Sequence, residues 1–201
     1  MGDVIDVGEN KMKIILATNT KHKLEEINEI SKNTKIEFTL PPANFDPNET
    51  GKTFAENSYI KAFEAAKLTN NIALADDSGL CVEALNGAPG IHSARYEETQ
   101  DKRIQKLLNE LAPFENKRAK FTCCMTIVAP DGNIIHQVIG ECHGHITENR
   151  KGSNGFGYDP IFVPDNYTCT LAELDEQEKN NISHRGNALR QIMEFLEKTS
   201  L

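Results

Sequence analysis

Residues 121–140 read FTCCMTIVAPDGNIIHQVIG, and this stretch decides the core of the fold. Two apolar runs that are rich in β-forming residues, 121–129 and 134–140, flank the tetrapeptide Pro-Asp-Gly-Asn at 130–133. Such turn residues between two β-rich runs are a strong signal for a β-hairpin. A further strand is expected at residues 141–146. The sequence therefore predicts antiparallel strands in this half of the chain.

Upstream of this hairpin, strand and helix patterns alternate. Short apolar runs at residues 13–17 and 72–75 predict strands, and helical spacing joins apolar residues further on. Thr53 followed by Glu56 forms a capping-box pattern at the start of one predicted helix. The apolar positions of the four predicted helices are Leu24, Ile27 and Ile30; Ala55, Tyr59, Ala62, Phe63 and Ala66; Ile104, Leu107, Leu108 and Leu111; and Ala188, Leu189, Ile192, Phe195 and Leu196. These patterns predict an α/β fold in which helices pack on a mixed β-sheet.

The bulk composition excludes several classes of protein. The chain has 201 residues and a net charge of −8, which argues against a general nucleic-acid-coating role. No apolar run approaches the length of a membrane span. Residues 1–11 carry acids where a signal peptide needs positive charge, so we interpret them as a flexible leader before a single domain at 12–201. The five cysteines are odd in number and lack CxxC spacing, which favours reduced thiols and a cytoplasmic location.

One cysteine lies close to two histidines, a combination that can bind zinc. Cys142, His143 and His145 fall within a single predicted strand. Because side chains alternate between the two faces of a strand, Cys142 is expected to point away from both histidines. We therefore predict no zinc site there.

The segment GSNGFGYDPIF at residues 152–162 is the strongest candidate for ligand binding. Its glycines let the backbone approach a ligand closely. Phe156 and Tyr158 offer flat faces, Asp159 offers an acceptor, and His184 and Arg185 offer donors about twenty residues later. This combination suits a flat heterocycle with polar edges. The alternative is a glycine-rich surface turn before a strand.

A second candidate lies where the first predicted strand meets the first predicted helix. Helix N-termini bind phosphate well because their free N–H groups and partial positive charge face the ligand. The hydroxyls of Thr18 and Thr20 and the ammonium of Lys23 would add further donors. The alternative is a capped helix with solvated lysines.

Acidic residues provide the third candidate. Asp76 and Asp77 follow the apolar run at 72–75, so we expect a polar turn there, with only one of the two carboxylates reaching a given site. Carboxylate oxygens suit Mg²⁺. Glu49 and Glu56 are candidates for a second ligand, and we favour Glu49 because Glu56 has the capping role.

In combination, these motifs resemble the inosine/xanthosine triphosphate pyrophosphatase family. The matching segments, in the family's order, are LATNTKHKLEEI (16–27), ETGKTFAENSYIKA (49–62), LADDSGLCVEALNGAPGIHSARY (74–96), GSNGFGYDPIF (152–162) and AELDEQEKNNISHRGNAL (172–189). The resemblance covers nearly the whole chain. It implies an elongated mixed sheet flanked by helices, with two lobes around a central cleft. It also implies Mg²⁺-dependent hydrolysis of ITP, dITP or XTP to monophosphate and pyrophosphate, in a homodimer.

The same resemblance assigns roles to individual residues. Asp77 matches the catalytic base and a metal ligand, and Glu49 matches a further metal-binding acid. The positions that match substrate contacts are Thr18, Asn19, Thr20, Lys23, Ser78, Phe156, Gly157, Tyr158, Asp159, Lys179, His184 and Arg185. Thr20 departs from the family pattern, which has asparagine there, and a hydroxyl lacks the two donors of an amide.

Two other functions are compatible with parts of this pattern. One is a pyrophosphatase for modified pyrimidine nucleotides, against which the Ser-His-Arg (183–185) and Phe-Gly-Tyr-Asp (156–159) segments argue. The other is a nucleotide sensor without catalysis, against which the acids at positions 49 and 77 argue.

Overall fold

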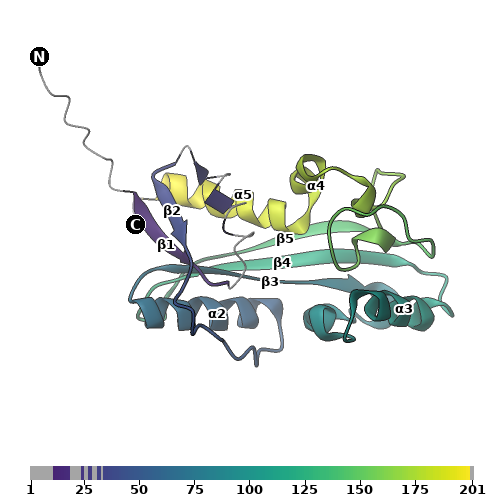
Figure 1. The fold of residues 1–201 in the computed structure, drawn as a ribbon, viewed down its shortest axis with the longest axis horizontal. Coiled ribbons are helices and arrows are strands. Elements are labelled where there is room, and N and C mark those ends of the chain that lie inside the picture. Colours follow the sequence, from purple (N-terminus) through teal and green to yellow (C-terminus); the bar gives the residue numbers. More distant parts are fainter. Residues whose placement is uncertain (1–10, 19–23, 25–26, 29–30, 33, 200–201) are drawn as a thin grey trace, which may run out of the picture.

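The computed structural model describes residues 11–18, 24, 27–28, 31–32 and 34–199. Six strands form one mixed sheet in the order β2-β1-β3-β4-β5-β6 (Figure 1). They are β1 (Met12–Leu16), β2 (Ile36–Thr39), β3 (Ala73–Val82), β4 (Arg118–Val128), β5 (Ile134–Ile146) and β6 (Phe162–Pro164). The strand β1 is parallel to both of its neighbours, and the pairs from β3 to β6 are antiparallel. The predicted α/β fold with a mixed sheet is confirmed.

Helices cover both faces of this sheet. The helices with described bounds are α2 (Phe54–Thr69), α3 (Gln100–Leu111), α4 (Glu176–Ile182) and α5 (His184–Lys198), and the helix expected around Leu24, Ile27 and Ile30 lies largely outside the described residues. Short 3-10 helices are η1 (Glu83–Leu85), η2 (Gly90–Arg95), η3 (Asp159–Ile161) and η4 (Leu171–Glu173). Figure 1 shows α2 and α3 on one side of the long strands and α4 and α5 on the other. The expectation of two lobes around a central cleft stays a prediction.

The predicted hairpin forms with one difference. The strands β4 and β5 are joined by a tight turn in which the Ala129 N–H donates to the Asn133 carbonyl (3.0 Å). Gly132 has φ 89°, a left-handed conformation that glycine adopts without strain. The runs at 134–140 and 141–146 were expected to be two strands, but they form the single strand β5. Gly140 does not break this strand, because β4 pairs with it on both sides of that position.

The prediction of a turn at residues 76–79 is wrong. These residues lie inside β3, which pairs with β4 along its whole length, from Ala73↔Val128 to Val82↔Ala119. Polar side chains are tolerated there because both carboxylates meet cations from the flanking helices. The backbone alternation that was expected for Asp76 and Asp77 is present, and their side chains lie on opposite faces of β3.

Side chains cap the starts of two helices, and the first cap is the one that the sequence predicts. The Thr53 hydroxyl accepts from the Glu56 N–H (3.1 Å), while a carboxylate oxygen of Glu56 accepts from the Lys52 N–H. At the second start, the Ser183 hydroxyl accepts from the Gly186 N–H (3.0 Å) and caps α5. These caps fix which residues occupy the first turn of each helix.

The helix α5 lies directly against β5. A Cβ added at Gly140 would stand 2.2 Å from the His184 carbonyl oxygen and 2.4 Å from the Ala188 nitrogen. Asn187 and Gln191 donate from α5 to the carbonyls of Glu141 (2.8 Å) and Ile139 (3.0 Å). The absence of a side chain at Gly140 therefore sets the position of the first turn of α5.

Several other expectations concern the termini, the cysteines and membrane insertion. The expected leader at residues 1–11 falls, except for residue 11, outside the described residues. Cys142 is buried, whereas His143 and His145 on the same strand are exposed, as the alternation predicts. All five cysteines are free thiols. Among the described residues, none of the helices has the length and apolar character needed to cross a bilayer.

Gly140→Ala is expected to lower the free energy of unfolding by about 1–3 kcal/mol, because the methyl group must push the first turn of α5 off β5. The measurement is urea unfolding followed by circular dichroism. Ile139→Ala, at an exposed neighbouring position on β5, serves as the control and should change the free energy by no more than about 0.5 kcal/mol. Equal stability of Gly140→Ala and the wild type would contradict the close contact.

Candidate active site

The site is centred on the edge of β3 that faces β1. The two strands pair only at Ile15↔Ala73 and Leu16↔Leu74, and the Ala17 N–H then donates to the Leu74 carbonyl (2.8 Å). Within the described part of the chain, the next β-partner on that side of β3 is Pro89, which forms an isolated bridge with Cys81. Just beyond the carboxyl end of β1, residues 76–78 therefore have no β-partner on this side among the described residues, whereas Gly79 packs against the Gly90 carbonyl of η2. Ligands of α/β proteins bind outside such strand ends.

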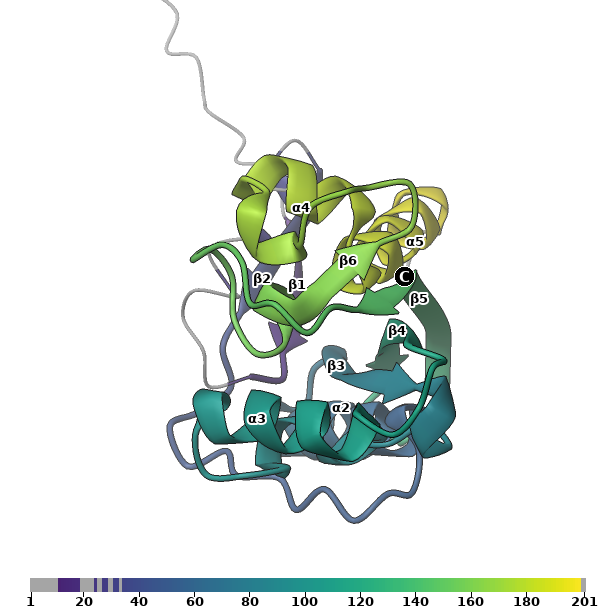
Figure 2. The ribbon, with the colours of Figure 1, turned by 90° about the vertical axis from the view of Figure 1, so that its right-hand side faces the viewer.

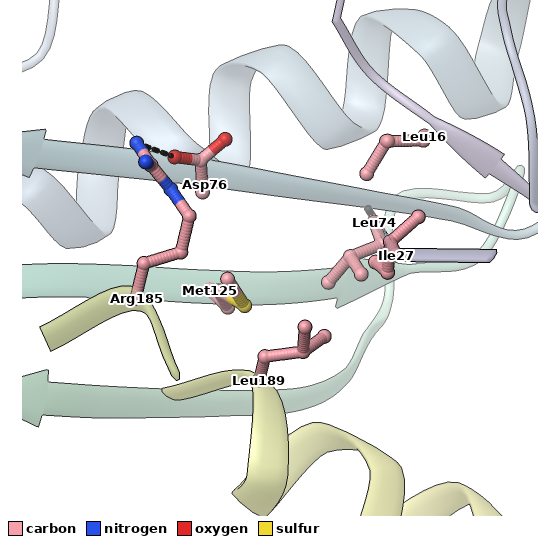
Figure 3. Close-up of a pocket in the computed structure, with 7 residues that line it drawn as sticks. All are labelled: Leu16, Ile27, Leu74, Asp76, Met125, Arg185 and Leu189. Carbon is pink, nitrogen blue, oxygen red and sulfur yellow. Dashed lines mark hydrogen bonds and ion pairs between the residues drawn. The ribbon is translucent and has the colours of Figure 1, made fainter. Parts of the chain in front are cut away.

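Asp76 faces the side of the sheet that α5 covers. Its Oδ2 lies 3.3 Å from Nη2 of Arg185, and the hydroxyl of Ser78 donates to the same oxygen (3.4 Å). Figure 3 shows this ion pair at one end of a small pocket between the sheet and α5. The pocket is lined by Leu16, Ile27, Leu74, Asp76, Met125, Arg185 and Leu189. This face thus offers an apolar floor with one oriented cation at its end.

Asp77 faces the opposite side, toward α2. Its Oδ1 lies 3.2 Å from the Nζ atom of Lys61, which is also 3.4 Å from Oε2 of Glu49. Burial raises the pKa of Asp77, although the positive charge of Lys61 acts against that shift. Burial alone would lower the pKa of Lys61, but the nearby carboxylates, with Asp77 foremost, outweigh it and raise that pKa. The lysine therefore stays charged and holds two carboxylates close together.

The loop that carries Glu49 is tied to α2. The Gly51 N–H donates to Oδ1 of Asn57 (2.8 Å), a side chain that is fully buried. A Cβ at Gly51 would come within 2.6 Å of the same oxygen, so glycine is needed there. Glu56 is used in the cap of α2, as described above, and only Glu49 shares Lys61 with Asp77 among the described acids that form ion pairs with this lysine.

The carboxylates of Glu49 and Asp77 fit a divalent cation such as Mg²⁺. Oδ2 of Asp77 is buried and has no hydrogen bond of normal geometry in the part of the chain that the structure describes, although the Asn57 side chain lies near enough to the carboxylate to lower its pKa. A buried carboxylate oxygen without a partner is costly unless another group occupies its lone pairs. The described residues contain no cluster of three or more potential metal ligands. Two carboxylates nevertheless suffice for Mg²⁺, which completes its shell with water and substrate phosphates.

The glycine-rich loop presents an exposed aromatic ring. The side chain of Phe156 is 57% exposed, with Nζ of Lys179 4.7 Å and Cζ of Arg185 5.5 Å from the ring centroid. Oδ2 of Asp159 accepts from Lys179 (2.6 Å) and from the Phe156 N–H (2.9 Å). A Cβ at Gly155 would stand 2.2 Å from that oxygen. We call these residues, Phe156, Asp159, Lys179 and Arg185, the aromatic platform.

Three of the expected substrate-contact residues join the loop to its surroundings. The hydroxyl of Tyr158 donates to the Ser93 carbonyl in η2 (3.1 Å), and burial raises the pKa of this tyrosine to about 12. The Gly157 N–H donates to Oε1 of Gln100 at the start of α3 (3.1 Å). The His184 ring is buried and stacks on Phe121, with centroids 4.8 Å apart. Their side chains or backbone hold the platform in place.

The expected phosphate-binding segment is only partly described. The N–H of Thr18 donates to the Leu16 carbonyl (2.7 Å) at the end of β1. Asn19, Thr20 and Lys23 lie outside the described residues. The strands β1 and β3 are parallel and pair at Leu16↔Leu74, so Thr18, two residues further on, lies near the level of Asp76. The role of the segment in phosphate binding stays a prediction.

The sequence interpretation missed Lys61. This residue lies four positions after Asn57, so both occupy the face of α2 that turns toward the sheet. Polar residues at 57, 58 and 61 interrupt the otherwise small apolar residues of that face. A lysine on the inner face of a helix needs a buried partner, and this signal indicated that a carboxylate lay opposite.

Asp76 and Asp77 thus connect two clusters of functional side chains. The aromatic platform, which includes Arg185, lies on the α5 side of β3, while Glu49 and Lys61 lie on the α2 side. Figure 2 shows the two helical layers on either side of β3. Both clusters therefore meet at residues 76–78 of β3, which have no β-partner toward β1 in the part of the chain that the structure describes. Arg185 does not meet Asp77 directly in the described contacts; it meets the adjacent Asp76.

A cation-flanked ring on one side of β3 and paired carboxylates on the other are features expected of an enzyme that binds a nucleotide. The profile of the Ham1 family matches residues 14–195, and the chain belongs to this family. It is 43% identical over 189 residues to a dITP/XTP pyrophosphatase of Prochlorococcus marinus, covering 94% of this chain and 96% of that protein. It is 47% identical over 180 residues to a dITP/XTP pyrophosphatase of Nostoc, covering 90% and 92%. A solved structure of a HAM1 protein from Coxiella burnetii has 41% identity and a TM-score of 0.86, over 94% of this chain and 100% of that chain.

Asp77→Asn is expected to leave the free energy of unfolding at neutral pH unchanged or higher. The raised pKa of Asp77 means that folding disfavours its charged form, a cost that is present above the folded-state pKa and absent below the unfolded-state value. Removing the charge removes this cost at pH 7.

Asp159→Asn is the matched comparison, because Asp159 is also buried and paired with a lysine, Lys179, but its Oδ2 accepts a further hydrogen bond from the Phe156 N–H. Asp159→Asn should lower the free energy of unfolding by about 1–3 kcal/mol. Both variants are compared by urea unfolding at pH 7. A larger loss for Asp77→Asn than for Asp159→Asn would show that the Asp77 carboxylate stabilises the fold.

Proposed function

We propose that this chain hydrolyses non-standard purine nucleoside triphosphates, ITP, dITP and XTP, to the monophosphate and pyrophosphate. The observation that carries the proposal is the arrangement around Asp76 and Asp77 of β3, where an exposed aromatic ring with cations lies on one side and a carboxylate pair with an ammonium lies on the other. This order of groups matches a purine at one end and its phosphates at the other. The names of the relatives support the same reaction.

In this proposal the phosphates occupy the α2 side of the edge. Lys61 carries a full positive charge beside Asp77 and attracts phosphate oxygens. Asp77 orients a water molecule toward the α-phosphorus and takes its proton on Oδ2, the oxygen without a hydrogen bond of normal geometry among the described residues. The new P–O bond forms as the bond between the α-phosphorus and the bridging oxygen breaks, and pyrophosphate leaves. Asp76 is the alternative group to orient this water.

Glu49 and Asp77 would hold the Mg²⁺ that the family resemblance implies. A bound Mg²⁺ supplies charge neutralisation on the phosphate oxygens and favours ionisation of a nearby water. Lys61 lies between the two carboxylates, so it keeps them in place before the ion and the substrate arrive. Thr18, Asn19, Thr20 and Lys23 would supply further donors to the phosphates.

The aromatic platform would select the base. Inosine and xanthosine carry a carbonyl at C6, which accepts hydrogen bonds, whereas adenine carries an amino group, which donates them. Arg185 and Lys179 are donors without acceptor capacity. A site built from such donors favours the carbonyl and leaves adenine unpaired, and sites of this kind can discriminate by about 10⁴-fold or more. Ser78, Gly157 and His184 line or support this region.

Three further expectations belong to the same proposal. Residues 12–201 act as one catalytic domain, the enzyme forms a homodimer, and it works in the cytoplasm. The family resemblance supports the dimer, and the free cysteines support a reducing compartment. Light scattering coupled to gel filtration gives the mass in solution and tests the dimer.

The test is a pyrophosphate-release assay with ITP, XTP, GTP, ATP and CTP, with and without Mg²⁺. We expect rapid release from ITP and XTP, little from ATP, and none without a divalent cation. Asp77→Asn should lower kcat by at least about 10²-fold, because it removes the proton acceptor. Its fold is checked by circular dichroism.

Other outcomes of this panel would support the alternatives. Faster turnover of methylated UTP or TTP than of ITP would indicate a pyrimidine pyrophosphatase. Binding of ITP without release of pyrophosphate would indicate a sensor. Near-normal turnover by Asp77→Asn would remove this residue from the reaction.

Phe156→Ala is expected to raise KM for ITP and XTP by similar factors, because stacking on a ring does not depend on the substituents of the purine. A loss of one base–aromatic stack of about 1–3 kcal/mol corresponds to about a five- to 150-fold rise. The measurement is steady-state kinetics with both substrates. A rise for only one of them would argue against stacking.

A further inference from the structure

The side chain of Arg185 links the two ends of the site. Its guanidinium carbon lies 5.5 Å from the centroid of Phe156, and its Nη2 lies 3.3 Å from Oδ2 of Asp76. It starts from the first turn of α5, which the Ser183 cap and the contact at Gly140 hold against the sheet. The backbone origin of Arg185 is therefore rigid, and the contacts at the far end of the side chain decide its orientation.

Asp76 is well placed to set that orientation. Its side chain is 13% exposed, and Oδ2 also accepts a hydrogen bond from the hydroxyl of Ser78 (3.4 Å). The carboxylate is thus held from the side of the strand as well as from Arg185. A guanidinium is planar, so a carboxylate that holds one terminal nitrogen also fixes the directions of the remaining donors.

We propose that Asp76 is a positioning residue for base selection, which acts by holding the Arg185 guanidinium in the orientation that donates to an acceptor on the purine edge. The inference rests on the proposed function and deepens it. Asp76 and Asp77 are adjacent in β3, yet they serve different ends of the substrate. Asp77 acts on the phosphate side, and Asp76 acts through Arg185 on the base side.

If Asp76 acts on the base side, its substitution should change the preference for ITP over ATP. Without the carboxylate, Arg185 samples more orientations, so its hydrogen bond to the C6 carbonyl of ITP becomes weaker. Binding of ATP changes little, because adenine accepts no hydrogen bond from Arg185 at C6. Asp76→Asn should therefore lower the ratio of kcat/KM for ITP to that for ATP by about tenfold, the value expected for one charge-assisted hydrogen bond. Most of the change should lie in KM for ITP.

A double-mutant cycle tests the route of the effect. If Asp76 acts through Arg185, then Asp76→Asn introduced into an Arg185→Ala background should leave the ITP-to-ATP ratio unchanged. Asp76→Glu, which keeps the charge, should restore part of the ratio. Ser78→Ala removes the other hydrogen bond to Oδ2 and should give a smaller change in the same direction.

Binding of product monophosphates separates this inference from the proposed reaction. Calorimetry with IMP and AMP, without Mg²⁺, should show that Asp76→Asn weakens IMP binding by about tenfold and changes AMP binding less than threefold. A wild type that prefers IMP but releases no pyrophosphate would overturn the proposed reaction and not the role of Asp76. Equal losses for ITP and ATP, with unchanged IMP binding, would overturn the role of Asp76 and assign it to the phosphate chemistry.

Discussion

The site depends on the short pairing of β1 with β3, which leaves most of β3 without a described β-partner on that side. Among the described residues, β1 pairs with β3 at two positions, while β3 continues for eight more residues on its β4 side. A strand edge that carries unpaired backbone groups is normally covered or charged. Here aspartates occupy it, and each is neutralised by a cation from a flanking helix. In the proposed function, a ligand bound at this part of β3 reaches side chains on both faces of the sheet.

Strand alternation then separates the chemistry into two halves. Asp76 turns toward α5 and meets Arg185, and Asp77 turns toward α2 and meets Lys61. A turn at the same residues would not impose this separation, because its side chains would not alternate. The ten-residue pairing of β3 with β4 is what keeps the two carboxylates on opposite faces. A substitution at Asp76 can therefore affect base recognition without affecting the phosphate chemistry at Asp77, although the two residues are adjacent in β3.

Close backbone packing supports this arrangement from the α5 side. Gly140 allows the helix start to touch β5, and Gly155, at φ 74°, leaves room for the pair of Asp159 and Lys179. These glycines are required by contacts between segments distant in sequence. A side chain at either position would move a cation of the platform away from Phe156. The rigidity of the platform thus comes from positions that carry no chemistry themselves.

Local signals in the sequence predicted those parts of the structure that local interactions determine. The cap at Thr53, the hairpin turn at 130–133 and the alternation of Cys142 against His143 depend on near neighbours, and all are present. The turn at 76–79 was wrongly expected because pairing with β4, more than forty residues away, outweighs the turn preference of Asp-Ser-Gly. Lys61 was missed because its partners, Glu49 and Asp77, come together only in the folded chain.

The most direct test of the central claim is a crystal structure of the protein with Mg²⁺ and an ITP analogue whose α–β bridging oxygen is replaced by methylene. One ligand molecule should cross the edge of β3, with its purine against Phe156 and its α-phosphate beside Asp77. A ligand that binds with its purine and phosphates on the same face of β3, out of contact with either Arg185 or Asp77, would contradict it.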